Sequence, residues 1–190
     1  MYKYLIGLLA SSLISLSAYA SLEAGDNAPK FEARASLAGE PFDFALEDAL
    51  AKGTVVVYFY PSAYTKGCNI QAHEFSVRMD EFTAAGASII GVSLDNIDRL
   101  NDFSADPDYC AGKLAVASDE SGEIARSYGL EIGDAVDGAK DTRGVEIGHG
   151  FAERTTFIVT PDGKIAETIG GVSPFENVEL TLAAVKRLKN

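Results

Sequence analysis

The residues whose types and spacing most clearly indicate reactivity lie in the segment 61–68, where Thr65 stands three residues before Cys68. The segment follows an apolar run and precedes a helical pattern, so it should carry Cys68 to the first turn of a helix. Free backbone amides and the helix dipole at such a turn stabilise a thiolate, which is the nucleophilic form of cysteine. Pro61 can fix the loop and shield the sulfur, and the Thr65 hydroxyl can reach the sulfur or an oxygen bound beside it. The segment therefore predicts a reactive thiolate.

Apolar patterns around this segment predict a strand, helix, strand unit. Residues 54–60 form a continuous β-branched and aromatic run, typical of a strand buried on both faces of a sheet, and residues 88–93 repeat that pattern. Between them, apolar residues recur at spacings of three and four from Cys68 to about Gly86, which indicates a helix packed on the sheet. The connection should be right-handed, with the two strands parallel.

The flanking segments predict the remaining elements. These are a hairpin at 31–36 and 42–44 turned at 39–41, a helix near 97–103, a strand at 114–117, a helix at 121–128, a long surface loop at 130–153, an antiparallel hairpin at 156–160 and 164–169, and a closing helix at 178–188. A βαβ unit followed by a hairpin and a helix is the element order of the thioredoxin fold. We therefore expect an α/β protein with a central mixed sheet flanked by helices and an N-terminal β-hairpin extension.

Pro61, Thr65 and Cys68 match the motif P-x-x-x-T-x-x-C. On this motif the chain, from Leu22 to its C-terminus, resembles the peroxiredoxins of the alkyl hydroperoxide reductase and thiol-specific antioxidant superfamily. Within that superfamily it is similar to the bacterioferritin-comigratory, or peroxiredoxin Q, branch and its exported bacterial relatives. The resemblance implies that Cys68 is the peroxidatic cysteine and that Pro61 limits solvent access to it.

The resemblance extends to residues 154–157 and 161–164, which are similar to the family segment that supplies the active-site arginine. It implies that Arg154, together with Thr65, holds the thiolate and the peroxide oxygens. A thiolate attacks one peroxide oxygen in line with the O–O bond, and a fixed guanidinium suits the charge that develops on the leaving oxygen. We therefore expect a thiol-dependent peroxidase that reduces hydrogen peroxide and organic hydroperoxides. Because the sulfur does the redox chemistry, we expect no cofactor and no metal ion.

The sequence leaves open which thiol recycles the sulfenic acid formed on Cys68. Many peroxiredoxin Q proteins carry a second cysteine five residues after the first, and here that position is His73. The candidates are Cys110, a cysteine of a partner chain, or an external reductant such as a thioredoxin- or glutaredoxin-like protein. Cys110 could instead be an inert core residue, which would leave a one-cysteine enzyme, or could form a structural disulfide with Cys68. Lys66, where proline is usual, changes no reactive group.

Two other classes of function compete with the peroxidase. Disulfide exchange on proteins needs C-x-x-C, and the missing cysteine at Thr65 argues against it. A non-catalytic redox-binding protein would hold a Cys68 that does not react with peroxide at neutral pH. A metal site formed by Cys68 and His73 is disfavoured because residues five apart on a helix point about 140° away from each other. We expect His149, in the glycine-rich loop, to be exposed.

The N-terminus has the features of a secretory signal peptide at residues 1–20. A short start with one lysine precedes an apolar stretch that ends in Ala18-Tyr19-Ala20. That stretch is shorter than the roughly 20 residues of a membrane span, so we expect a chain exported to the periplasm or secreted, with no membrane insertion after cleavage. Residues 21–190 suit a single domain, as a monomer or homodimer. The net charge of −12 disfavours nucleic acid and anionic membranes as partners.

Overall fold

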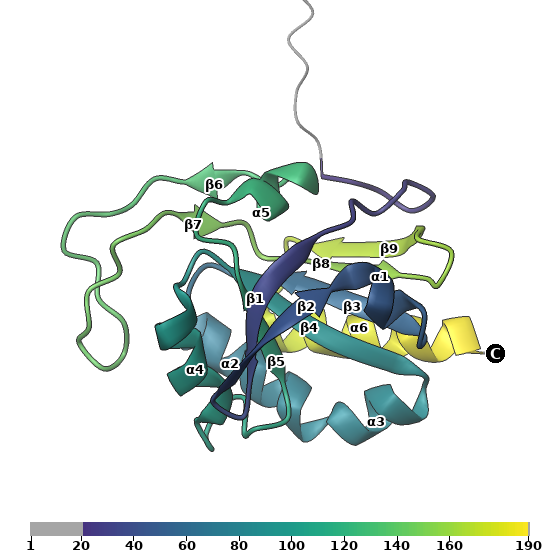
Figure 1. Cartoon of the computed structure of the whole chain (residues 1–190), viewed down its shortest axis with the longest axis horizontal. Coiled ribbons are helices and arrows are strands. Elements are labelled where there is room, and N and C mark those ends of the chain that lie inside the picture. Colours follow the sequence, from purple (N-terminus) through teal and green to yellow (C-terminus); the bar gives the residue numbers. More distant parts are fainter. Residues whose placement is uncertain (1–20, 190) are drawn as a thin grey trace, which may run out of the picture.

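The computed structural model describes residues 21–189, so the predicted signal peptide lies outside the described residues. A seven-stranded mixed sheet in the order β2-β1-β5-β4-β3-β8-β9 forms the centre, helices cover both of its faces, and β6 pairs with β7 separately (Figure 1). The strands are β1 (Glu32–Leu37), β2 (Glu40–Ala45), β3 (Thr54–Phe59), β4 (Ala87–Ser93), β5 (Ala115–Ser118), β6 (Ile132–Gly133), β7 (Phe151–Ala152), β8 (Thr155–Val159) and β9 (Ile165–Gly170). The helices are α1 (Leu46–Leu50), α2 (Lys66–Val77), α3 (Met79–Ala84), α4 (Ile97–Ala105), α5 (Glu123–Ser127) and α6 (Pro174–Lys189). The predicted α/β arrangement is confirmed. Among the described residues, no helix is both long enough and apolar enough to cross a membrane.

Strand β3 shows why two apolar layers form around the sheet. Successive side chains of a strand point to opposite faces, and in β3 both faces are apolar. Val56 and Tyr58 pack with residues of α2, α3, α4 and α6 on one face. Val55, Val57 and Phe59 pack with residues of α1 and α5 on the other face. The prediction of a strand buried on both faces is therefore confirmed.

Three strand ends meet at one edge of the sheet. Strands β3 and β4 run parallel, so their carboxyl ends lie at the same edge. Strand β8 runs antiparallel to β3, with Thr155 opposite Phe59, so β8 begins where β3 ends. This edge therefore collects the segment that leads from β3 into α2, the residues that follow β4, and Arg154 at the start of β8.

The helix that carries Cys68 differs from its predicted extent. The sequence predicts one helix from Cys68 to about Gly86, whereas α2 begins two residues earlier, at Lys66, and is separated from α3 at Arg78. Arg78 leaves the helical conformation, with φ −99° and ψ 7°. The apolar spacing continues through this break, because α3 packs on the same face of the sheet as α2.

The N-terminal hairpin turns one residue earlier than its sequence indicates. The turn residues are Ala38 and Gly39, with φ 54° and 84°. A two-residue turn with both φ angles positive matches the twist of paired strands, so Pro41 falls within β2 rather than in the turn. The proline is accommodated because β2 is an edge strand.

The glycine-rich segment 130–153 contains a short two-stranded sheet that its sequence does not predict. Strands β6 and β7 pair near its two ends, and an isolated bridge joins Lys140 to Glu146. Figure 1 shows the segment extending away from the central sheet. The rest of it is irregular, as expected for a surface loop.

Candidate active site

Cys68 lies on the first turn of α2, as the sequence predicts. It is the third residue of the helix, and it is only 1% exposed. The first backbone N–H groups of a helix have no partner within the helix, and the helix dipole places partial positive charge there. The position therefore places the sulfur at the positive end of a helix and shields it from bulk water.

Thr65 and Pro61 belong to the loop that precedes the cysteine. Thr65 is the N-cap residue of α2, with an extended backbone. Its hydroxyl donates a hydrogen bond to the carbonyl oxygen of Ser62, at 2.9 Å, so the hydroxyl oxygen keeps capacity to accept. Pro61 follows Tyr60 at the end of β3 and is half-buried. Both residues thus lie on the chain between the sheet and Cys68.

Arg154 directs its guanidinium at the cysteine. Its Nη2 donates to Cys68 Sγ at 3.4 Å, and its Nη1 donates to Gln71 Oε1. Gly67 leaves the space for this approach, because a Cβ at that position would lie only 3.1 Å from Nη2. The fold therefore brings together two predicted site residues that lie 86 positions apart in the sequence.

A buried hydrogen-bond network stands behind the guanidinium. Gln71 is fully buried, and its Nε2 donates to Asn177 Oδ1 at 2.9 Å. Asn177, on α6, also accepts from Thr156 Oγ1 at 2.7 Å and donates from Nδ2 to the Ile169 carbonyl at 3.0 Å. The amide thus ties α6 to α2, β8 and β9. This network fixes the orientation of Gln71 and, through it, of Arg154.

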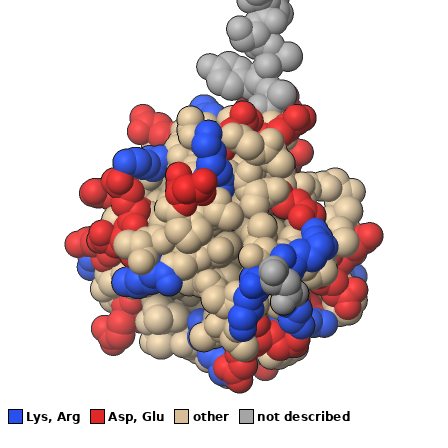
Figure 2. All heavy atoms as spheres, turned by 90° about the vertical axis from the view of Figure 1, so that its right-hand side faces the viewer, with Lys and Arg blue, Asp and Glu red and all other residues tan. Residues whose placement is uncertain are grey.

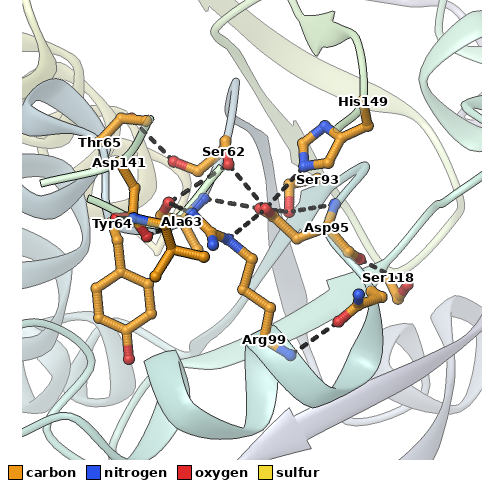
Figure 3. A network of polar contacts seen from close by, with 12 residues as sticks. Ser62, Ala63, Tyr64, Thr65, Ser93, Asp95, Arg99, Ser118, Asp141 and His149 are labelled. Atoms are coloured by element: carbon orange, nitrogen blue, oxygen red, sulfur yellow. Dashed lines mark hydrogen bonds and ion pairs between the residues drawn. The ribbon is translucent and has the colours of Figure 1, made fainter. Parts of the chain in front are cut away.

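A second set of contacts anchors the loop before Cys68. Asp95, two residues after β4, is fully buried, and its carboxylate accepts hydrogen bonds from Ser62 Oγ and the Ala63 backbone N–H, both at 2.7 Å. Figure 3 shows this carboxylate in the centre of the network, with His149 on the side away from the loop. Burial raises the pKa of Asp95, but hydrogen bonds from His149, Ala63, Ser93 and Ser62 outweigh it and lower the pKa below its usual value. The carboxylate therefore stays charged inside the protein.

His149 is half-buried, so the expectation that it is exposed is wrong. Its Nε2 lies 2.9 Å from Asp95 Oδ1, and its side chain is 21% exposed. The reason is that parts of the segment 130–153 contact Asp95 and the active-site loop, although the segment extends away from the central sheet. Thr142 of this segment donates its backbone N–H to the Tyr64 carbonyl at 2.9 Å, which fixes a second point of contact.

Cys110 lies in the segment after α4 and is fully buried in the same apolar cluster as Cys68. Among residues 21–189 both cysteines are free thiols. Burial raises the pKa of the Cys110 thiol far above its usual value, and the charge of Asp106 raises it further. His73 of α2 donates from Nδ1 to the Asp108 carbonyl at 3.0 Å, so α2 contacts the segment that holds Cys110.

Besides His149, three residues of this arrangement are missing from the sequence-based site. Gln71 stands three residues after Cys68, which on a helix places both on one side, so its spacing was a usable signal. Asn177 and Asp95 had no such signal, because a single amide or carboxylate at the end of an apolar pattern is usually solvated. Their roles depend on which strand ends meet at the edge of the sheet.

The chain was compared in sequence and in structure with known proteins. Residues 24–168 match the AhpC/TSA family. The chain is 33% identical over 144 residues to peroxiredoxin Bcp of Escherichia coli strain K12, covering 76% of this chain and 83% of that protein. Among solved structures, it resembles peroxidoxin BcpB of Mycobacterium tuberculosis with a TM-score of 0.73 and 25% identity, covering 89% of this chain and 99% of that one. It also resembles the Xanthomonas campestris bacterioferritin comigratory protein, whose trapped intermediate and ligand complexes concern alkyl peroxide reduction, with a TM-score of 0.65 and 27% identity over 83% of this chain and 92% of that one.

Proposed function

Since this chain belongs to the AhpC/TSA family and its relatives are peroxiredoxins, we propose that it is a thiol-dependent peroxidase in which Cys68 reduces hydrogen peroxide and organic hydroperoxides. The Cys68 thiolate attacks one peroxide oxygen, an S–O bond forms, and the O–O bond breaks. The leaving oxygen takes up a proton and departs as water or an alcohol. The sulfur is oxidised to a sulfenic acid as the peroxide is reduced.

The contact between Arg154 and Cys68 carries this proposal. A guanidinium nitrogen 3.4 Å from the sulfur stabilises the thiolate and can hydrogen-bond the peroxide oxygens that approach it. Thr65 complements this role, because a hydroxyl that donates to Ser62 can still accept a hydrogen bond from the peroxide O–H. Pro61, at the start of the loop between β3 and α2, limits the access of water to the sulfur.

We infer that Cys110 resolves the sulfenic acid. Its thiolate attacks the oxidised sulfur of Cys68, an S–S bond forms, and hydroxide leaves with a proton as water. Both sulfurs are buried in one apolar cluster, and burial keeps the Cys110 thiol protonated in the folded protein. Resolution therefore requires the first turn of α2 or the segment after α4 to open, which lets Cys110 ionise. A thioredoxin- or glutaredoxin-like dithiol would then reduce the disulfide.

The signal-like N-terminus supports export to the periplasm or secretion for the same enzyme. The acidic net charge of −12 fits a protein that reacts with small hydroperoxides and a protein reductant rather than with nucleic acid. The domain comprising residues 21–190 would act as a monomer or homodimer. Sequencing the N-terminus of the protein recovered from outside the cytoplasm tests the cleavage site.

Intact-mass spectrometry of the reduced protein, before and after one equivalent of hydrogen peroxide, tests the chemistry. We expect the wild type to lose two hydrogens, Cys110→Ser to gain one oxygen, and Cys68→Ser to keep its mass. Gain of oxygen or a linked dimer in the wild type would support a one-cysteine or intermolecular cycle instead. An unchanged mass in the wild type would refute the peroxidase.

A further inference from the structure

The Asp95 carboxylate is the point at which three parts of the fold meet behind the active-site loop. It accepts hydrogen bonds from Ser62 and Ala63 of that loop, each at 2.7 Å. From α4, Arg99 Nε lies 2.9 Å from Asp95 Oδ1, and from the segment 130–153, His149 Nε2 lies at the same distance. Figure 3 shows the carboxylate between these groups. Ser93 Oγ also donates to the carboxylate, at 2.7 Å. Since Asp95 is fully buried, its charge depends on all of these partners.

The geometry around His149 is that of a protonated imidazole. Nε2 faces the Asp95 carboxylate at 2.9 Å, and Nδ1 faces the Gly150 carbonyl at 2.8 Å. Both partners are acceptors, so both ring nitrogens must donate. A neutral imidazole has only one N–H and would leave one of the two acceptors without a partner.

Charged groups on both packed elements act on this imidazole. Burial lowers the pKa of His149, but the hydrogen bonds to Asp95 and Gly150 and the charge of Asp95 outweigh it and raise the pKa above its usual value, while Arg99 opposes them. A cavity of about 570 Å³ lies beside the ring, and its other charged lining residues are Asp98, Asp102, Arg143 and Glu146. Arg99 and Arg143 are both paired with Asp141, so their charges are partly compensated.

We propose that Asp95 and His149 are positioning residues of the peroxidase, in which protonated His149 holds the Asp95 carboxylate and the carboxylate holds the loop that presents Thr65 and Cys68. The inference rests on the proposed function of Cys68. The Ser62 hydroxyl donates a hydrogen bond to Asp95, and the Ser62 carbonyl accepts a hydrogen bond from the Thr65 hydroxyl. Asp95 therefore fixes the residue that orients the Thr65 hydroxyl.

Deprotonation of His149 should loosen this arrangement. When the imidazole loses a proton, either Asp95 or Gly150 loses its hydrogen bond, and the buried carboxylate loses a cationic neighbour. The loop is then held less tightly, and a misplaced attacking sulfur or hydroxyl slows a reaction that depends on alignment. The rate constant of oxidation per thiolate should therefore fall as the pH rises through the titration of His149.

Single-turnover oxidation of Cys68 by hydrogen peroxide, measured from about pH 5 to about pH 9 and divided by the thiolate fraction, tests the proposal. The chain holds two histidines, so His73→Gln is a matched control for His149→Gln. A glutamine at position 149 can still donate to Asp95 but does not titrate. In the wild type and in His73→Gln, we expect the oxidation rate constant per thiolate to fall about tenfold as the pH rises through the His149 titration. In His149→Gln, we expect no such fall. Asp95→Asn should be at least about tenfold slower throughout the range.

An unchanged inflection in His149→Gln would overturn the proposal, and so would an oxidation rate of folded Asp95→Asn close to that of the wild type. If Asp95→Asn does not fold, the profile of His149→Gln alone decides. Alkylation of Cys68 by iodoacetamide, mapped by peptide mass, repeats the comparison without peroxide. If the wild type alkylates but does not react with peroxide, the proposed function fails, and the alkylation profiles then decide whether Asp95 and His149 position the loop.

Discussion

Gly67 sets the distance between the active-site cation and the sulfur. A Cβ at this position would lie 3.1 Å from Arg154 Nη2 and 3.3 Å from Pro174 Cγ. Both contacts are tighter than ordinary van der Waals packing, so an alanine must displace the guanidinium by a few tenths of an ångström. Since Arg154 contacts the reacting sulfur, this small shift acts directly on catalysis.

We expect Gly67→Ala to lower the rate constant of Cys68 oxidation by about tenfold. Its free energy of unfolding should change by no more than about 1 kcal/mol, because the preference of helices for alanine over glycine offsets the strain of the two tight contacts. Quenched single-turnover kinetics and urea unfolding measure the two quantities. Gly133→Ala is the control, since the nearest atom to its Cβ would lie 3.8 Å away. A Gly67→Ala enzyme with the wild-type rate would contradict the role of this contact.

The site is predictable from the sequence where a residue's chemistry is fixed by its neighbours along the chain. The spacing of Thr65 and Cys68 after an apolar strand was sufficient to place the sulfur on a helix start. Arg154 is predicted only from the family resemblance. Asp95 and His149 could not be found, because a buried ion pair is recognised by its surroundings, and these come from segments far apart in the sequence.

At the scale of the elements, α6 holds the active-site edge together through one side chain. Asn177 is 1% exposed, and its side-chain amide forms hydrogen bonds with the side chains of Gln71 and Thr156 and with the carbonyl of Ile169. An apolar replacement leaves these buried polar groups without a partner. Each such group costs about 1–3 kcal/mol, so the helix and the orientation of Arg154 depend on the same amide.

We expect Asn177→Ala to lower the free energy of unfolding by at least about 2 kcal/mol. Its folded fraction should also oxidise more slowly, because Gln71 no longer holds Arg154 in one orientation. Urea unfolding gives the first quantity, and oxidation rates under native conditions give the second. The exposed neighbour on the same helix, Glu179→Ala, should match the wild type in both. If Asn177→Ala were as stable as Glu179→Ala, the network would not support the helix.

Elements with long apolar patterns in the sequence are predicted more accurately than short ones. The long apolar runs of β3 and β4 predict strand bounds that lie within a residue or two of those observed. The break at Arg78 escaped prediction because the apolar stripe continues across it, and β6 and β7, of two residues each, are too short to carry a pattern. Short pairs of this kind form because the chain between them folds back, not because of local propensity.

Across the whole molecule, charge is distributed in two ways. On the face at the C-terminal end of α6, acidic and basic side chains alternate around an uncharged area (Figure 2). There the pairs Lys186–Glu81 and Arg187–Glu167 are exposed, so solvent and salt screen them. The pairs around Asp95 are buried, so their contribution to stability should depend on pH more strongly than that of the exposed pairs.

The signs of the two pKa shifts define where this response occurs. Asp95 has a lowered pKa in the folded protein, so its contribution is present above the usual carboxyl value of about 3.9 and is lost as the pH falls through the folded pKa. His149 has a raised pKa, so its contribution is complete below the usual value of about 6.5 and is lost as the pH rises through the folded pKa. Both contributions are present together between about pH 4 and about pH 6.5.

We therefore expect the stability difference between the wild type and His149→Gln to be largest in that window, at about 1 kcal/mol, and to shrink as the pH rises through the His149 titration. Urea unfolding at a series of pH values measures the difference, and His73→Gln provides the matched control. In the Asp95→Asn background, adding His149→Gln should cause no such pH-dependent change, because Asp95 is the charge partner of the imidazole. A difference that stays constant, or grows toward alkaline pH, would show that His149 is neutral in the folded protein and that its contact with Asp95 stabilises the fold as an ordinary hydrogen bond.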